Sequence, residues 1–314
     1  AAGRKVFLAG NIGKSAIEAL AKNKNTPMAV LEFSSFQLHD LDLSPEVAVM
    51  LDVFPDHQDA HTSLQEYYEA KANIGRFQKR SDKIFYFADN AMSKKLAIKS
   101  PAQKVAVDYR KFKKFGEGDL FIKGRHNFRN AVMAAMVAKS LGVDWTTIRK
   151  VVKSYRGLEH RLEFVRKIGS INFYDDSAST NPTTTAAALA AFGKERKILI
   201  AGGMDKVWDY SPIVQALRKH GAELVILFGE NKNKIRKAIG GVAKVKVVRN
   251  LEEAVKLTYK IIVDSDANIR MHTNYANKKE IAVIFSPGAA SFDMFKDYAD
   301  RGNKFKTLVA RLTK

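Results

Sequence analysis

The chain of 314 residues contains no cysteine. This absence excludes a disulfide scaffold, a zinc site built on thiolates and a cysteine nucleophile. The sequence also lacks the roughly 20 consecutive apolar residues that a helix needs to cross a bilayer. Its beginning does not resemble a secretory signal, because Arg4 and Lys5 are followed by only four apolar residues before Gly10. We therefore expect a cytoplasmic protein of a reducing compartment that handles a ligand.

Acidic residues are scarce relative to basic ones. The 53 Lys and Arg residues outnumber the 33 Asp and Glu residues, which leaves a formal charge of +20. Such a charge attracts anions of every kind, including nucleotides and nucleic acids. The densest basic runs, Arg110–Lys114 and Lys232–Lys237, are not accompanied by a zinc-finger, RNP or basic-heptad pattern. We interpret them as solvated faces of helices and loops, and we expect no nucleic-acid partner.

Short apolar runs alternate with segments of helical period along the whole chain. The apolar runs are rich in Val, Ile and Phe, which is typical of buried strands; they are Val6–Ala9, Ala29–Glu32, Val47–Leu51, Ile84–Phe87, Ile171–Tyr174, Lys197–Ile200, Leu224–Phe228, Val245–Val248 and Ile281–Phe285. The helical segments are Ser15–Lys22, Ser63–Gln78, Asn127–Leu141, Thr146–Ser154, Thr183–Ala191, Ser211–His220, Leu251–Val263 and Lys304–Leu312. This alternation predicts an α/β fold with parallel sheets covered by helices on both faces.

A domain boundary is predicted near Gly157–Arg161, where two successive helices give way to a new series of strands. We expect an incomplete α/β domain at 1–158 and a Rossmann-like domain at 159–314. The chain starts at Ala1 rather than at a methionine, and we expect it to be a fragment. The polar, non-periodic segment Asp264–Glu280 predicts a surface loop.

Two loops of the first half follow predicted strands. Gly10–Ser15 opens a helix, but its spacing fails the phosphate-loop motif; it is either an anion site at a helix N-terminus or a plain turn. Glu32 ends a strand and is followed by the hydroxyls of Ser34 and Ser35, which suits Mg²⁺ or phosphate, although a capping or surface role is also open.

Histidine, lysine and asparagine positions of the first half allow two interpretations each. His57 and His61 are four residues apart, but Gln58 stands where a metalloprotease needs Glu. Two interpretations remain: His57 ligates a divalent ion that is bound to a nucleotide, or these are polar residues of a loop. Lys71 on an amphipathic helix is by itself typical of a solvated residue. Two asparagines three residues apart, Asn127 and Asn130, either read a purine edge or cap a helix.

The second half carries three polar loops after predicted strands. They are Asp175–Pro182, Ala201–Lys206 and Ser286–Asp293. Strand-end loops that face one edge of a sheet favour a ligand crevice over three independent turns. Arg161, at the predicted hinge, is placed to meet a phosphate or to pair with Glu159 or Glu163.

Taken together and in this order, the motifs resemble those of the Mur ligase family, in particular its glutamate-adding branch. The matching segments are GNIG (Gly10–Gly13), EFSSFQL (Glu32–Leu38), PDHQDAH (Pro55–His61), YYEAKANI (Tyr67–Ile74), GRHNFRN (Gly124–Asn130), GLEHRLEF (Gly157–Phe164), DDSASTNPT around Asp176, AGGMDK (Ala201–Lys206) and SPGAASFDMFKDYADRG (Ser286–Gly302). The resemblance implies a central ATPase-type parallel-sheet domain, here truncated, followed by a Rossmann-like domain that binds glutamate.

The resemblance also implies roles for single residues. It implies that ATP and Mg²⁺ are used, with Glu32, His57 and a carbamylated Lys71 around the metal, and it makes these three and Arg161 the catalytic residues. The implied nucleotide contacts are Asn127, Asn130, Arg161 and Asp176. The implied contacts to the incoming glutamate are Thr180, Lys206, Ser291 and Tyr298, and those toward the muramoyl substrate are Asn11, Gly13, Ser34 and Ser35.

The implied reaction adds D-glutamate to UDP-N-acetylmuramoyl-L-alanine through an acyl phosphate. We expect the protein to act as a monomer. The family's glycine-rich phosphate loop and its N-terminal domain are expected upstream of Ala1, so we expect the chain as it stands to be an impaired catalyst. Asp52, Ala60 and Ala178 replace residues that are usual in the family, which bears on substrate positioning. The alternatives are an L-glutamate-adding ligase, a folylpolyglutamate-type ligase and a catalytically silent nucleotide-binding fragment.

Overall fold

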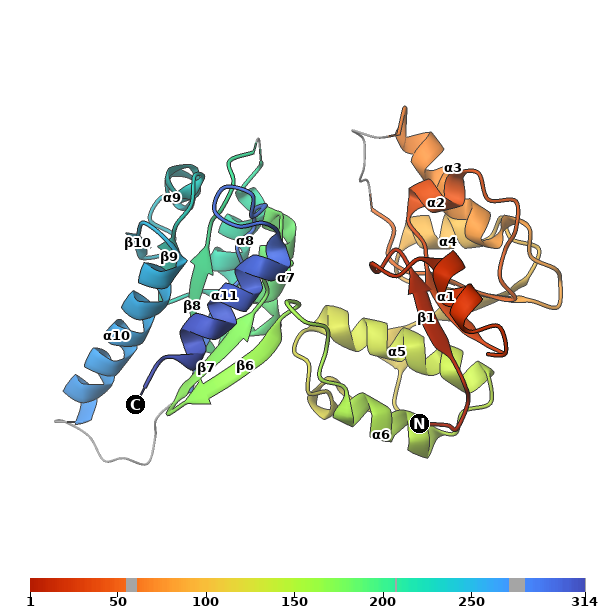
Figure 1. Ribbon diagram of the computed structural model, residues 1–314, viewed down its shortest axis with the longest axis horizontal. Helices are drawn as coiled ribbons and strands as arrows, with labels where there is room; N and C mark the ends of the chain where they lie inside the picture. Colours follow the sequence, from red (N-terminus) through yellow and green to blue (C-terminus); the bar gives the residue numbers. More distant parts are fainter. Residues whose placement is uncertain (55–60, 207, 271–279, 314) are drawn as a thin grey trace. The chain divides into compact units, whose positions relative to one another are not determined.

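A computed structural model describes residues 1–54, 61–206, 208–270 and 280–313 (Figure 1). The chain forms two compact units. The first comprises residues 1–116 and 129–152, and the second comprises residues 117–128 and 153–314. Two helices contain residues of both units: α5 (Arg125–Ser140) and α6 (Trp145–Ser154). They follow each other without a strand, as predicted.

The second unit is built on a six-stranded sheet with the strand order β10-β9-β8-β11-β7-β6. The strands are β6 (Glu163–Ile168), β7 (Ile171–Asp175), β8 (Arg196–Ala201), β9 (Leu224–Leu227), β10 (Val245–Val247) and β11 (Ile281–Phe285). The five strands from β10 to β7 are parallel, which confirms the prediction. The edge strand β6 was not predicted and runs antiparallel to β7, because a two-residue turn with Gly169 at a φ of 60° returns the chain directly.

Helices cover both faces of this sheet because its central strands are apolar on both sides. Every residue of β9 and β11 is buried. On one face the core includes residues of α7 (Pro182–Ala191), α8 (Ser211–His220) and α9 (Lys232–Ile239). On the other face it includes residues of α10 (Leu251–Arg270) and α11 (Tyr298–Ala310).

Two helix boundaries of the second unit correct the expectations from the sequence. The predicted loop Asp264–Glu280 is wrong for its first seven residues, because α10 continues to Arg270. Residues 271–279 lie outside the described part of the chain. The last helix begins at Tyr298 rather than at Lys304, since the Asp297 carboxylate accepts a hydrogen bond from the Asp300 amide and so caps an earlier turn.

The first unit contains two separate parallel sheets. One pairs β1 (Phe7–Gly10) with β2 (Ala29–Glu32), and the other has the order β3-β4-β5. The remaining elements are β3 (Val47–Met50), β4 (Lys83–Phe87), β5 (Gln103–Val107), α1 (Ala16–Lys22), α2 (Ser35–His39), α3 (Leu64–Arg76) and α4 (Ala91–Ala97). The core of this unit joins β3 and β4 to α3 and α4. Among the described helices of both units, none has the length and hydrophobicity that a membrane crossing requires.

Candidate active site

Three strands of the second unit end side by side at one edge of the sheet. Phe285, the last residue of β11, is level with Asp175 at the end of β7 and with Ile200 near the end of β8. The polar loops that follow these strands are therefore neighbours, which confirms the prediction that they share an edge. In doubly wound sheets ligands bind at this carboxyl edge.

Backbone hydrogen bonds join the three loops to one another. The Gly288 amide donates to the Ser179 carbonyl at 2.9 Å, and the Met204 amide donates to the Ala290 carbonyl at 2.9 Å. A Cβ at Gly203 would lie only 2.5 Å from the Ala290 carbonyl oxygen. The second glycine of the AGGMDK segment is therefore required by close packing of two loops.

The doubled aspartate at the end of β7 has two different environments. Asp175 is fully buried; its Oδ2 lies 2.7 Å from Nδ1 of the buried His160, and its Oδ1 accepts the Ser177 amide at 2.9 Å. Asp176 is partly exposed as a residue at the edge of the sheet, but its carboxylate is desolvated. The N-cap of α7 is Asn181, whose Oδ1 accepts the Thr184 amide, so neither aspartate caps the helix.

Asp176 is held by hydrogen bonds from two other segments. Its Oδ1 accepts the Leu162 amide at 3.0 Å, and its Oδ2 accepts the Ser286 hydroxyl at 2.7 Å. Burial of this carboxylate raises its pKa to about 6. A carboxylate with a raised pKa at the carboxyl edge of a parallel sheet is a candidate functional group.

Arg161 is exposed and lies between two residues with positive φ, His160 at 60° and Leu162 at 49°. Such conformations are uncommon for residues with side chains and often mark functional segments. The alternative in which Arg161 pairs with Glu159 or Glu163 is not observed. Lys306 takes both partners, with its Nζ 3.1 Å from Glu159 and 3.3 Å from Glu163.

The residues expected to hold glutamate lie on or beside the same loops. Thr180 is half-buried, Lys206 and Tyr298 are exposed, and Ser291 is buried. Tyr298 begins α11, and its ring meets the His160 ring edge-on with centroids 6.2 Å apart.

In the first unit, the glycine turn after β1 packs tightly against the end of β2. A Cβ at Gly10 would overlap the Glu32 carbonyl oxygen, and the Asn11 amide donates to that same oxygen at 2.8 Å. Asn11 and Gly13 are exposed, and so is Glu32. The backbone thus places the GNIG turn beside the strand-end carboxylate.

The hydroxyls that follow Glu32 make contacts within the protein. Ser34 caps α2 in a capping box with Gln37. This short helix was not predicted. Ser35 is buried, with its Oγ 2.9 Å from Nε2 of His61. His61 also stacks on Phe36 at 4.9 Å between ring centroids. It therefore belongs to a packed aromatic cluster.

The expected metal ligands are placed only in part. His57 lies outside the described residues. Lys71 is half-buried in the middle of α3, with its ammonium 5.0 Å from the Tyr67 ring centroid, so it is not the fully solvated lysine that helix position alone suggests. Glu32 is an oxygen donor exposed at the end of β2.

The two asparagines expected at the nucleotide both lie on the first turns of α5. The Asn127 amide nitrogen donates to the Lys123 carbonyl at 2.8 Å, and Asn130 is exposed. Between them, Arg129 donates to Asp52 and to Asp89, both at 2.9 Å. Its guanidinium also lies over the Phe87 ring at 4.4 Å from the centroid. This anchor was missed, because Asp52 alone gave no sign of its partner.

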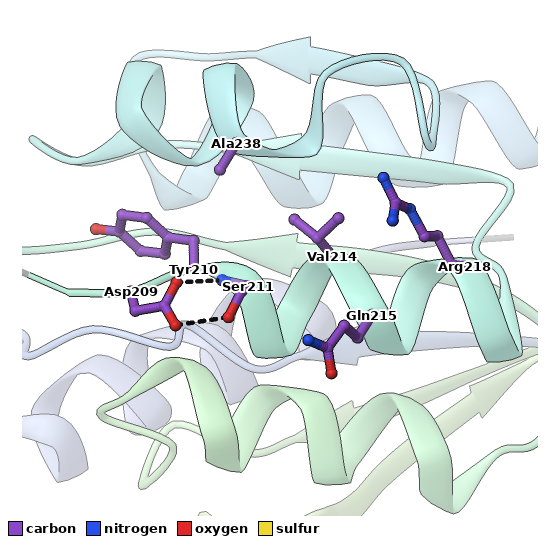
Figure 2. Close-up of a pocket in the computed structure, with 7 residues that line it drawn as sticks. All are labelled: Asp209, Tyr210, Ser211, Val214, Gln215, Arg218 and Ala238. Atoms are coloured by element: carbon purple, nitrogen blue, oxygen red, sulfur yellow. Dashed lines mark hydrogen bonds between the residues drawn. The ribbon is translucent and has the colours of Figure 1, made fainter.

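A separate cavity of about 320 Å³ lies beside α8 (Figure 2). Figure 2 shows Tyr210, Val214 and Arg218 reaching toward it, with Asp209 bonded to Ser211 at the start of the helix. None of the site residues expected from the sequence lines it. The candidate active site of the second unit is therefore the loop edge of its sheet, where the residues predicted in the second half of the chain lie.

Comparison with known proteins shows the family to which both halves of the chain are similar. The model of the Mur ligase middle domain matches residues 8–138, and that of the Mur ligase glutamate ligase domain matches residues 160–269. A UDP-N-acetylmuramoylalanine--D-glutamate ligase of Acetivibrio thermocellus is 36% identical over 337 residues, which cover 98% of this chain and 68% of that protein. A protein of the same name from Aquifex aeolicus is 34% identical over 316 residues, with 97% and 72% covered.

Solved structures share the fold at lower identity. A MurF ligase from Thermotoga maritima in complex with ADP has a TM-score of 0.65 at 16% identity, with 99% of this chain and 75% of that chain covered. A folylpolyglutamate synthase from Mycobacterium tuberculosis complexed with ADP has a TM-score of 0.68 at 16% identity, with 95% and 71% covered.

The fold and the relatives together define an ATP-dependent ligase of the class that joins an acid to an amino acid. Within that class, the chain belongs to the Mur ligase family.

Proposed function

We propose that this protein adds D-glutamate to UDP-N-acetylmuramoyl-L-alanine during the synthesis of peptidoglycan precursors, as a cytoplasmic monomer. The observation that carries the proposal is the match of nearly the whole chain to D-glutamate ligases at 34–36% identity. The loop edge of the second unit supports it, because it gathers hydroxyl, carboxylate and lysine side chains suited to an amino acid. In this proposal residues 1–158 bind ATP and residues 159–314 bind glutamate.

The chemistry needs an activated acid. A carboxylate does not accept an amine at neutral pH, because its oxygen is a poor leaving group. A carboxylate oxygen of the nucleotide substrate attacks the γ-phosphorus of ATP, ADP leaves, and an acyl phosphate forms. The amine of glutamate then attacks the acyl carbon, loses a proton, and phosphate leaves with the former carboxylate oxygen.

The second unit supplies groups for both halves of this reaction. Arg161 offsets negative charge on the transferring phosphoryl group, and Asp176 holds the ribose of ATP. The incoming glutamate is held by Thr180, Lys206, Ser291 and Tyr298. On α5, Asn127 of the second unit and Asn130 of the first contact the nucleotide. The muramoyl substrate is held by Asn11, Gly13, Ser34 and Ser35.

Mg²⁺ is expected with ATP, and the donor set fits it in part. Glu32 offers the exposed carboxylate oxygen that a hard cation prefers. His57 would be a second ligand. An ammonium group cannot bind a cation, so Lys71 would act only after carbamylation, which makes it an oxygen donor. When bound, the ion neutralises charge on the phosphate oxygens.

Phosphate release with each glutamate enantiomer tests the proposal. The product of the complete gene is incubated with ATP, Mg²⁺ and UDP-N-acetylmuramoyl-L-alanine. Release with D-glutamate alone is expected. Release with L-glutamate, or only with a folate-type acceptor, would support the alternative ligases, and no release with any of these would support a catalytically silent protein.

Thr180→Val tests the glutamate site itself. We expect the KM for D-glutamate to rise about tenfold, since loss of one hydrogen bond costs about 1–1.5 kcal/mol. Thr183→Val is the matched control, because Thr183 is exposed on the first turn of α7, and it should leave the KM unchanged. Equal effects of the two substitutions would remove Thr180 from the site.

A further inference from the structure

Arg301 in α11 is the largest fully buried side chain of the described residues. Its guanidinium is inaccessible to water, and burial lowers its pKa to about 10. Burying a charge is costly unless hydrogen bonds compensate. None of its hydrogen bonds within the described part of the chain goes to a carboxylate.

Within the described part of the chain, the side-chain hydrogen bonds of Arg301 go to loops at the carboxyl edge of the sheet. Nε donates to the Ser177 hydroxyl at 3.0 Å, and one terminal nitrogen donates to the Ser177 carbonyl at 2.8 Å. The other terminal nitrogen donates to the carbonyls of Ala289, at 2.9 Å, and Ala290, at 3.2 Å. A Cβ at Gly203 would lie 3.1 Å from this nitrogen, so the third loop also packs against it. One side chain thus contacts all three loops.

The buried pair of His160 and Asp175 extends this set of contacts to the segment that contains Arg161. Asp175 bonds to the Ser177 amide and to His160, and the His160 carbonyl accepts the Ala178 amide at 3.0 Å. Gly302, the residue after Arg301, packs so closely that a Cβ there would overlap the His160 ring. The buried group consists of His160, Asp175, Ser177 and Arg301, and we call it the buried network.

Residues assigned to substrates follow residues that belong to the buried network or bond to it. Arg161 follows His160, and Asp176 follows Asp175. Ser291 follows Ala290, whose carbonyl accepts a hydrogen bond from Arg301. The carbonyl of Tyr298 accepts the Ser177 hydroxyl at 2.7 Å. The network thus binds the backbone of Tyr298 directly and contacts the chain next to Arg161, Asp176 and Ser291.

We propose that Arg301 is a positioning residue that fixes the loops of Thr180 and Ser291 in the geometry that receives glutamate. This inference rests on the proposed function. Its physical basis is that a rigid planar fork with several donors can hold several carbonyls at once, whereas lysine supplies only a point charge. Displacement of binding groups by about 1 Å costs up to about 100-fold in rate.

The test compares Arg301→Gln with Arg301→Lys and with Arg311→Gln, an exposed arginine at the end of the same helix. We expect Arg301→Gln to raise the KM for glutamate at least tenfold and to change the KM for ATP less than threefold. Arg301→Lys should restore part of the loss, and Arg311→Gln should change neither KM. Equal changes in the two KM values, or none, would overturn the proposal.

Amide hydrogen exchange provides a readout that does not depend on activity. Arg301→Gln should speed exchange in residues 176–180 and 288–291 at least tenfold, and leave α8 and α9 unchanged. Ser177→Ala removes only the hydroxyl contact and should give a smaller change in the same residues. Unchanged exchange in these loops would refute the positioning role even if wild-type protein shows no ligase activity. Inactive wild-type protein with the expected exchange pattern would refute the proposed function alone.

Discussion

The carboxyl-terminal edges of the two units differ in how firmly they are built. In the second unit every residue of β11 is buried, and the loops beyond the strands are joined by buried hydrogen bonds. In the first unit every residue of β2 is exposed, and α1 has no buried residue. The comparison teaches that similar strand-loop-helix patterns produce a fixed binding edge only where the strand is covered on both faces.

Truncating one strand side chain in each unit, a buried one in β11 and an exposed one in β2, should show this difference most strongly. Phe285 is fully buried and stacks on Phe305 with ring centroids 4.6 Å apart. Phe285→Ala should lower the free energy of unfolding of the second unit by about 3–5 kcal/mol. Val30→Ala on β2, where the side chain is half exposed, should change that of the first unit by less than about 0.5 kcal/mol.

The chain offers a separate fluorescent reporter for each unit. Its two tryptophans are Trp145 in the first unit and Trp208 in the second. Urea unfolding of Phe285→Ala is followed in a Trp145→Phe background, and that of Val30→Ala in a Trp208→Phe background. A similar loss for both truncations would break the comparison.

The elements that the sequence predicted best are the strands buried on both faces. Strands such as β9 and β11 are continuous apolar runs, so composition alone identifies them. The strand β5 was missed because four of its five residues are at least partly exposed and two are polar. The extension of α10 to Arg270 was missed because its last turns are polar.

Site residues could be predicted from the sequence only where they belong to a local motif. Strand-end loops with Asp176, Thr180 and Ser291 were identified from their place after apolar runs. The contacts of Arg301 with Ser177 and Ala289 were not, because the partners are 124 and 12 residues away and no local pattern records them.

The next largest expected effect is on the pH dependence of the free energy of unfolding, through the carboxylate of Asp176. Its pKa is about 6 in the folded protein, whereas an unfolded aspartate titrates near 4. Between these values the folded protein binds more protons, so its free energy of unfolding falls as pH rises. An asparagine side chain does not titrate, so the Asp176→Asn variant should become more stable relative to wild type by at most about 3 kcal/mol from pH 4 to pH 7.

The measurement is urea unfolding of both proteins across this range, followed through Trp208. A stability difference that stays constant with pH, or that falls, would show that Asp176 is not held in a desolvated site. It would also weaken the view that the edge of the second unit is closely packed.

The ion pairs of Arg129 with Asp52 and Asp89 provide a matching test in the first unit. Arg129→Met leaves Asp52 and Asp89 without their shared cation and should lower the free energy of unfolding by about 1–2 kcal/mol. Lys139→Met, at an exposed position of the same helix, should change it by less than about 0.5 kcal/mol. Unfolding followed through Trp145 measures both, and equal losses would show that the anchor contributes nothing specific.

The most direct test of the account follows one oxygen atom. UDP-N-acetylmuramoyl-L-alanine labelled with ¹⁸O in its alanine carboxylate is supplied to the product of the complete gene with ATP and each glutamate enantiomer. The account predicts one ¹⁸O in each released phosphate with D-glutamate and no turnover with L-glutamate. Unlabelled phosphate, or turnover with L-glutamate alone, would contradict it.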